Sequence, residues 1–164
     1  MSVRLPDELM ASGPVRPRVR VWLKLLKITK IVEQIVRENL RAEFDTTLPR
    51  FDVLAALDRF EEGLKMSELS AALRVSNGNV TGIIERLVSD GMVLRVPVEG
   101  DKRATLVRLT RKGQEEFAKM ATAHARWVSE ILADLAPEDC EHVIGILDVV
   151  GRTHKQTERV GDHD

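Results

Sequence analysis

The stretch NGNVTGIIERLVSD, residues 77–90, decides the fold of this chain. Its apolar residues recur at i, i+3, i+4, i+7 and i+8, which places them on one buried stripe of a helix: Val80, Ile83, Ile84, Leu87 and Val88. The opposite face carries Gly78 and Gly82, although a glycine inside a helix costs about 1 kcal/mol relative to alanine. This face indicates that a partner such as a nucleic acid approaches the backbone closely. The alternative interpretation is an ordinary surface helix whose glycines have no role.

A second helix is predicted directly before this one. We expect Ser67 to cap a helix over residues 68–73, with Leu69 and Leu73 facing inward. Residues 74–76 then form a three-residue turn, and Gly91 ends the helix that follows. Two short helices joined by such a turn make a helix-turn-helix.

Beyond Gly91 the apolar period shortens to that of a β-strand. Residues 92–96 and 104–109 are aliphatic and β-branched, and the loop 97–103 between them contains proline, glycine and charged residues. The pattern predicts a two-stranded hairpin with a charged tip, which we call the wing. Residues 86–112 hold seven basic and three acidic residues, although the net charge of the whole chain is only −1. This local excess predicts a surface that meets an anion.

Longer amphipathic helices flank this central part of the chain. They are predicted over residues 18–44, 49–61 and 111–135, the last capped by Thr110, and from Pro137 to about residue 150. Their expected buried residues are Leu25, Ile28, Val32, Ile35, Val36 and Leu40, then Phe51, Leu54, Ala55 and Leu57, then Phe117, Met120, Ala121, His124, Val128, Ile131, Leu132 and Leu135, and finally Val143, Ile146, Leu147 and Val150. Because the central part is too small to cover such long helices, we expect them to pack across a two-fold axis between two copies.

Composition indicates a folded, mostly helical cytoplasmic protein. Of the 164 residues, 43% are hydrophobic and 31% charged, and no apolar run is long enough to span a membrane. The N-terminus lacks the apolar core of a signal peptide. The single cysteine, Cys140, excludes an intramolecular disulfide and is typical of a reducing compartment.

Two stretches resemble the MarR family of winged-helix transcription regulators. Residues 101–113, DKRATLVRLTRKG, are similar to the family's D-x-R-…-V-x-L-T-x-x-G wing signature. The family's helix-turn-helix pattern is matched by LS at 69–70, VT at 80–81, IERLV at 84–88 and Gly91. The resemblance covers about residues 20–150. A finer likeness, of residues 48–54 and 76–81, is to members that control aromatic-acid catabolism, some of which respond to hydroxycinnamoyl-CoA thioesters.

The resemblance implies a fold that is mainly α with a small β wing, a winged helix-turn-helix with dimerisation helices from both termini. The expected division is an N-terminal arm (1–17), a helical dimerisation domain (18–48 and 111–155), a DNA-binding domain (49–110) and a C-terminal tail (156–164). It also implies a homodimer that represses from a palindromic operator and is released by a small aromatic or acyl ligand.

Helix 77–90 is expected to enter the major groove of double-stranded DNA, because the start of the second helix usually contacts base edges in helix-turn-helix proteins. Asparagine can bond adenine and threonine can contact the thymine methyl group. Arg103, at the wing tip, is expected in the minor groove, while by family analogy Arg86 reaches toward the wing. Asp101 is expected to brace Arg86 or Arg103. The expected DNA-binding residues are Ser76, Asn77, Gly78, Asn79, Thr81, Gly82, Arg86, Arg95, Lys102 and Arg103.

The family's usual effector cleft lies between helices that are present here. The candidate effector-binding residues are Trp22, Leu26, Arg50, Phe51, Leu54, Met120, His124 and Trp127, with Arg50 or His124 meeting a carboxylate or phosphate. The alternative is an ordinary core with one exposed arginine.

Other function classes are less well supported by the sequence. It contains no glycine-rich phosphate loop, activated nucleophile or paired carboxylates, so we expect no enzyme and no cofactor. A metal-responsive regulator would have to use Cys140, His142, His154 and His163, which lack the usual ligand spacing, and no metal site is predicted. The main alternative is a winged helix that binds proteins instead of DNA.

Overall fold

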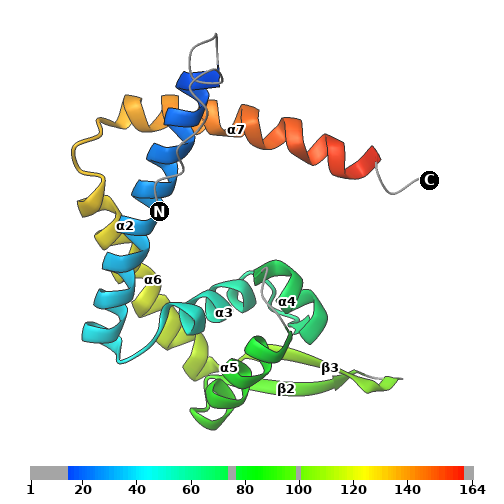
Figure 1. Ribbon diagram of the computed structural model, residues 1–164. Helices are drawn as coiled ribbons and strands as arrows, with labels where there is room; N and C mark the ends of the chain where they lie inside the picture. Colours follow the sequence, from blue (N-terminus) through cyan, green and yellow to red (C-terminus); the bar gives the residue numbers. More distant parts are fainter. Residues whose placement is uncertain (1–14, 74–76, 99–100, 161–164) are drawn as a thin grey trace. The chain divides into compact units, whose positions relative to one another are not determined.

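The computed structural model describes residues 15–73, 77–98 and 101–160, and their side chains except those of 77, 98, 101–104 and 153–160 (Figure 1). It comprises two compact units, residues 1–127 and 128–164. The elements run in the order α2 (Val15–Phe44), α3 (Leu48–Asp58), β1 (Leu64–Lys65), α4 (Met66–Leu73), α5 (Asn77–Ser89), β2 (Val93–Val98), β3 (Asp101–Leu109), α6 (Arg111–Ile131) and α7 (Pro137–Val160). The predicted class, mainly α with a small β wing, is confirmed. None of the helices in these ranges is both long and apolar enough to cross a membrane.

The core of the first unit lies between the C-terminal part of α2, helices α3, α4 and α5, and the sheet. Its most deeply buried side chains are Leu40, Val53, Leu54, Leu57, Leu69, Val80, Ile84, Leu87, Val93 and Val107. The buried stripe predicted for α5 is therefore present, with one correction. Val88 is 38% exposed, because eight residues of helix turn it by about 80° away from Val80.

Different hydrogen bonds cap the start of α4 and the end of α5, the two helices of the helix-turn-helix. The backbone N–H of Lys65 donates to the Glu68 carboxylate at 2.7 Å, so Glu68 caps α4. The prediction that Ser67 caps this helix is therefore wrong. Gly91 has φ +71°, and the backbone N–H of Met92 donates to Leu87 O at 2.9 Å, the bond of a Schellman C-cap. The prediction that Gly91 ends α5 is confirmed.

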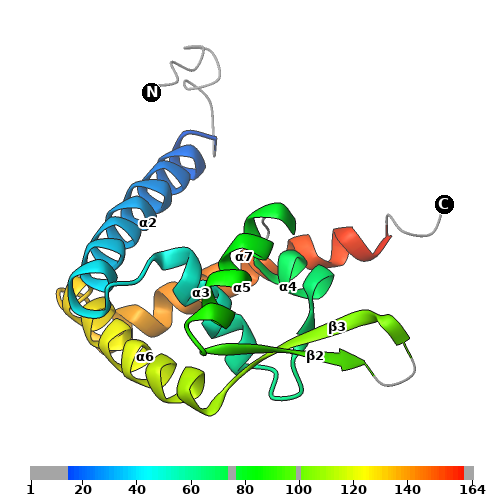
Figure 2. The same cartoon turned by 90° about the horizontal axis from the view of Figure 1, so that it is seen from below.

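The sheet has three strands instead of the two that were predicted, in the antiparallel order β1-β3-β2. Leu64 of β1 pairs with Val107 of β3, and Val93 of β2 pairs with Leu109. Figure 2 shows β2 and β3 side by side. The strands also extend into the predicted loop 97–103. Pro97 pairs with Thr105 beside a register shift in β2, which is possible because proline is tolerated at a bulge on an edge strand.

Several helix ends differ from the prediction. Helix α2 begins three residues earlier, with Pro17 in its first turn, where the missing N–H has no helical partner to lose. Helix α3 ends early because the chain turns tightly toward Gly63, at φ +91°. Helix α6 also ends earlier, at Ile131, while α7 continues through Gly151 to Val160. One glycine without a proline is too weak a signal to end a helix of 24 residues.

Two helices carry apolar faces that this single chain leaves uncovered. On α2, side chains between 38% and 57% exposed are Val21, Trp22, Leu23, Leu25, Ile28 and Ile31. On α7, side chains between 41% and 57% exposed are Val143, Ile144, Ile146, Leu147, Val149 and Val150. Leu132 and Leu135 are also exposed. One chain therefore does not bury Leu25, Ile28, Leu132, Leu135 or the predicted α7 residues, and their expected burial between two copies stays a prediction.

Gly113 allows α6 to pack against the end of α5. A Cβ atom at Gly113 would lie 1.9 Å from the carbonyl oxygen of Met92, which already accepts the Thr110 N–H. We expect Gly113→Ala to lower the free energy of unfolding by about 2 kcal/mol, measured by urea denaturation. Gly145→Ala is the control, because a Cβ there meets no described atom within 4 Å. Equal stability of the two variants would contradict this packing.

Candidate nucleic-acid interface

The glycine-bearing face of α5 is open in this chain. Gly78 and Gly82 are both exposed, and a Cβ atom added to either would meet no described atom within 4 Å. The packing of the chain therefore gives no reason for glycine at these positions. Because each one weakens the helix, a partner that approaches the backbone explains them better than the fold does.

A cavity of about 350 Å³ lies against this face. It is lined by residues 45–47 of the α2–α3 connection, by Arg50 of α3, and by Gly78, Asn79, Gly82, Ile83 and Arg86 of α5. Two guanidinium groups from different helices border the cavity, against one carboxylate from Asp45. Arg50 is paired with Asp90, so the guanidinium group of Arg86 is the one that can meet an anionic partner beside the bare backbone of α5.

The structure places part of the predicted DNA-binding set on one element. Asn79, Thr81 and Arg86 are exposed on α5, and Arg95 is exposed on β2. Ser76 and the side chains of Asn77, Asp101, Lys102 and Arg103 lie outside the described residues, and so does the expected bracing by Asp101. The backbone nevertheless puts residues 101–103 at the start of β3, next to the tip of the wing.

The C-terminal end of α5 holds residues that the sequence interpretation missed. Asp90 accepts a charge-assisted hydrogen bond from Arg50 of α3. Its carbonyl oxygen accepts a hydrogen bond from the ammonium group of Lys112 at 2.8 Å. The Thr110 hydroxyl donates to the neighbouring carbonyl of Gly91 at 2.7 Å, and also accepts the N–H of Gly113 at 3.0 Å, which confirms the predicted cap of α6. The only sequence signal for Asp90 was an acid at the unfavourable end of a helix.

Some candidate effector residues do meet, around Phe51. Its ring stacks on His124 at 5.0 Å between centroids and lies 5.5 Å from Phe117. Nearby, partial desolvation and then the charge of Glu33 raise the pKa of Asp52, while His124 lowers it. The surroundings of His124 therefore include the Asp52 carboxylate. An anionic group is better placed at Arg50 than at His124.

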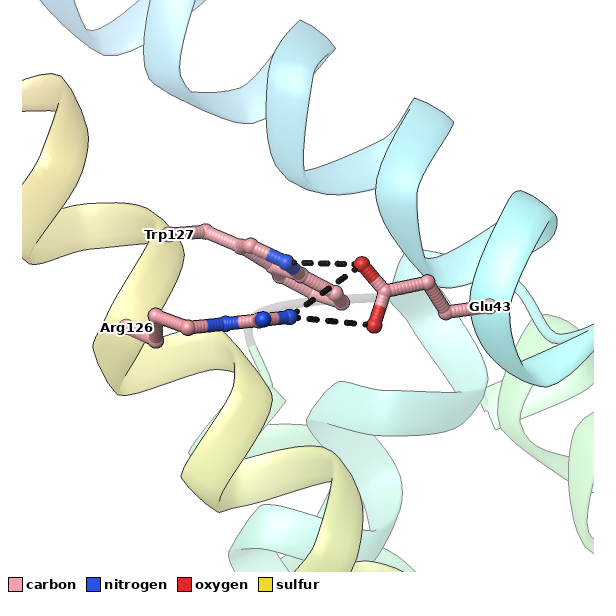
Figure 3. A network of polar contacts seen from close by, with 3 residues as sticks. All are labelled: Glu43, Arg126 and Trp127. Carbon is pink, nitrogen blue, oxygen red and sulfur yellow. Dashed lines mark hydrogen bonds and ion pairs between the residues drawn. The ribbon is translucent and has the colours of Figure 1, made fainter.

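The remaining candidates belong to the core or lie apart. Leu54, Met120 and Trp127 are buried. The Trp127 indole N–H donates to Glu43 at 3.1 Å, and Arg126 donates to the same carboxylate, which joins α2 to α6 (Figure 3). Trp22 is 21 residues before Glu43 on α2, about 30 Å along the axis. One chain therefore does not bring all eight predicted effector residues into one cleft.

Among the described residues, no group of three histidine, cysteine, aspartate or glutamate side chains is arranged to hold a metal ion. Cys140, on α7, is partly exposed. His142 is exposed on the same helix, and the side chains of His154 and His163 lie outside the described part.

Comparisons with known proteins agree with this arrangement. Residues 44–104 match the model of the MarR family. The transcriptional activatory protein BadR of Rhodopseudomonas palustris is 31% identical over 147 residues, which cover 88% of this chain and 83% of BadR. A MarR family transcriptional regulator from Silicibacter pomeroyi is 31% identical, with a TM-score of 0.73 over 87% of this chain and 99% of that one.

A mutant of MarR from E. coli, complexed with operator DNA, has the same fold, with a TM-score of 0.70, 24% identity and coverage of 85% and 99%. The likeness to BadR and to the Silicibacter regulator extends beyond the helix-turn-helix into the flanking helices. The protein is therefore a DNA-binding transcriptional regulator and not an enzyme, and the chain belongs to the MarR family.

Proposed function

We propose that this regulator acts as a homodimer that represses transcription from a palindromic operator and is released by a small aromatic or acyl ligand. The observation that carries the DNA-binding part is the open glycine face of α5 beside Arg86, which borders the cavity. In this proposal α5 enters the major groove, Asn79 and Thr81 contact base edges, and Arg103 enters the minor groove. Arg95 and Lys102 contact phosphates.

Gly82→Ala separates DNA binding from folding. Because the added methyl group meets no described atom, we expect the variant to be at least as stable as the wild type. If the DNA backbone approaches this face, operator affinity falls at least tenfold, about 1.4 kcal/mol.

The measurement is fluorescence anisotropy with a duplex selected from a random pool, next to urea denaturation of both proteins. Lys119→Gln, an exposed change on α6 away from the proposed DNA-binding and dimer faces, should leave affinity unaltered. Unchanged operator binding by Gly82→Ala would exclude close approach of DNA to this face.

The homodimer is supported by the two uncovered apolar faces. Each of these two helices carries several large apolar side chains that are exposed within a few turns, and exposed apolar patches on a soluble protein mark interaction sites. Pairing of two copies would cover these faces and set the two α5 helices about 34–36 Å apart, one turn of duplex. A palindromic operator follows from that symmetry.

A charged side chain introduced on the apolar face of α2 or of α7 should dissociate the dimer. We expect Ile28→Glu and Ile146→Glu each to shift the protein from dimer to monomer in sedimentation experiments, since both side chains are about half exposed in one chain. Operator affinity should fall with the dimer. Phe60→Gln is the control, because Phe60 is equally exposed but lies on neither helix. A wild-type protein that sediments as a monomer at all concentrations would contradict the proposal.

Ligand release is supported by the ring cluster of Phe51, Phe117 and His124 on α3 and α6. An aromatic group can stack there, with its carboxylate or phosphate directed to Arg50. We expect an aromatic acid or an aromatic CoA thioester to dissociate the operator complex at constant salt, and His124→Ala to raise the concentration required. If none of these compounds releases the DNA, the regulator is constitutive.

Activation is the second candidate for the sign of regulation, because the similar protein BadR is named as an activatory protein. Expression of a reporter gene behind the selected operator, with and without the regulator, distinguishes activation from repression.

A further inference from the structure

Asp90, the residue directly after α5, connects three helices. Arg50 of α3 donates to its carboxylate, and Lys112 of α6 donates to its carbonyl oxygen at 2.8 Å. These two bonds join the C-terminal end of α5 to α3, whose Arg50 precedes Asp90 by 40 residues, and to α6, which follows the wing. We call this set of three residues the α5 joint.

The charge arrangement of the α5 joint is unusual. A carboxylate at a helix C-terminus faces the negative end of the helix dipole, so Asp90 is tolerated because Arg50 and Lys112 surround it. Stability does not explain this choice. The Asp90 side chain is 46% exposed and that of Arg50 22%, and ion pairs with exposed partners contribute little to stability. The Nε atom of Arg50 is moreover buried without a partner among the described residues, which is unfavourable.

A change in the angle of α5 about the joint displaces the N-terminal end of the helix most. Residues 77–79, where base contacts are expected, lie about 18 Å from the joint along a helix of 13 residues. A tilt of about 10° about the joint moves that end by about 3 Å, which is more than a hydrogen bond to a base edge tolerates. A contact that fixed the angle of α5 at the joint would therefore also fix the position of the residues that would contact bases.

We propose that Arg50 is a positioning residue for DNA recognition, which fixes the angle of α5 relative to α3 through Asp90 and does not itself contact DNA. The inference rests on the proposed function of α5 in the major groove. The competing role is direct phosphate binding, since Arg50 also borders the cavity beside Gly78 and Gly82. The two roles differ in their dependence on salt, because a lost phosphate contact lowers the slope of log affinity against log salt by about one.

The test exchanges the two charges. Arg50 lies in the first turn of α3, which begins at Leu48, and Asp90 follows the last turn of α5. The double variant Arg50→Asp with Asp90→Arg therefore moves an acid to a helix start and a base to a helix end, both of which the dipoles favour. The exchange restores an ion pair with the opposite sense and removes the arginine from the cavity.

We expect Arg50→Gln and Asp90→Asn each to weaken operator binding about tenfold, while non-specific duplex binding and the salt slope stay as in the wild type. The charge exchange should return operator affinity to within threefold of the wild type. Lys119→Gln is the matched control, because it breaks the exposed Lys119–Glu116 pair of α6, which lies outside the joint. Thermal unfolding of every variant checks that the fold is retained. If Arg50→Gln does not fold, operator binding by Asp90→Asn is the measurement that tests the proposal.

Three outcomes would overturn the proposal. A salt slope lowered by about one in Arg50→Gln, without rescue by the exchange, would assign Arg50 to a phosphate. Wild-type operator binding by both single variants would show that the joint does not position α5, while the proposed DNA-binding function would stand. A wild-type protein without salt-sensitive duplex binding would instead contradict the proposed function itself.

Discussion

The close packing at Gly91 and Met92 is the constraint on which the rest of the first unit depends. Here α5 ends in a Schellman turn, the carbonyl of Met92 accepts the N–H of Thr110, and Gly113 leaves room for that carbonyl. The same few residues thus end α5, begin β2, follow β3 and start α6. The start of α6 is therefore held directly against the end of α5 by a backbone hydrogen bond and by close packing.

Local chemistry explains which parts of the fold could be predicted. Gly91 and Thr110 act on residues within five positions of themselves, so their roles as the end of α5 and the cap of α6 follow from sequence. Pairing partners are not local. The two-residue strand β1 forms because Leu64 pairs with Val107 of β3. Pro97 can belong to a strand because β2 lies at the edge of the sheet. Neither fact is contained in the composition of its own stretch.

The candidate site likewise contains residues with a local sequence signal and residues whose partners are distant in the sequence. Gly78 and Gly82 were recognisable because a glycine pair on one helix face conflicts with helix propensity. The partnership of Arg50 and Asp90 spans 40 residues and shows no periodicity, so Arg50 was assigned to an effector and Asp90 only to the end of its helix. The uncovered faces of α2 and α7 expose a further limit: amphipathic spacing predicts burial, but it does not distinguish burial within one chain from burial between two.

Helix α3 links the proposed ligand response to the proposed DNA reading, because adjacent residues on it face the two sites. Arg50 pairs with Asp90 at the end of α5, while the next residue, Phe51, stacks on His124 and contacts Phe117 of α6. A ligand that inserts between Phe51 and His124 would have to move α3 against α6. Since Phe51 is buried and tightly packed, that movement would carry Arg50 with it, and the ion pair that orients α5 would change before any group touched the DNA.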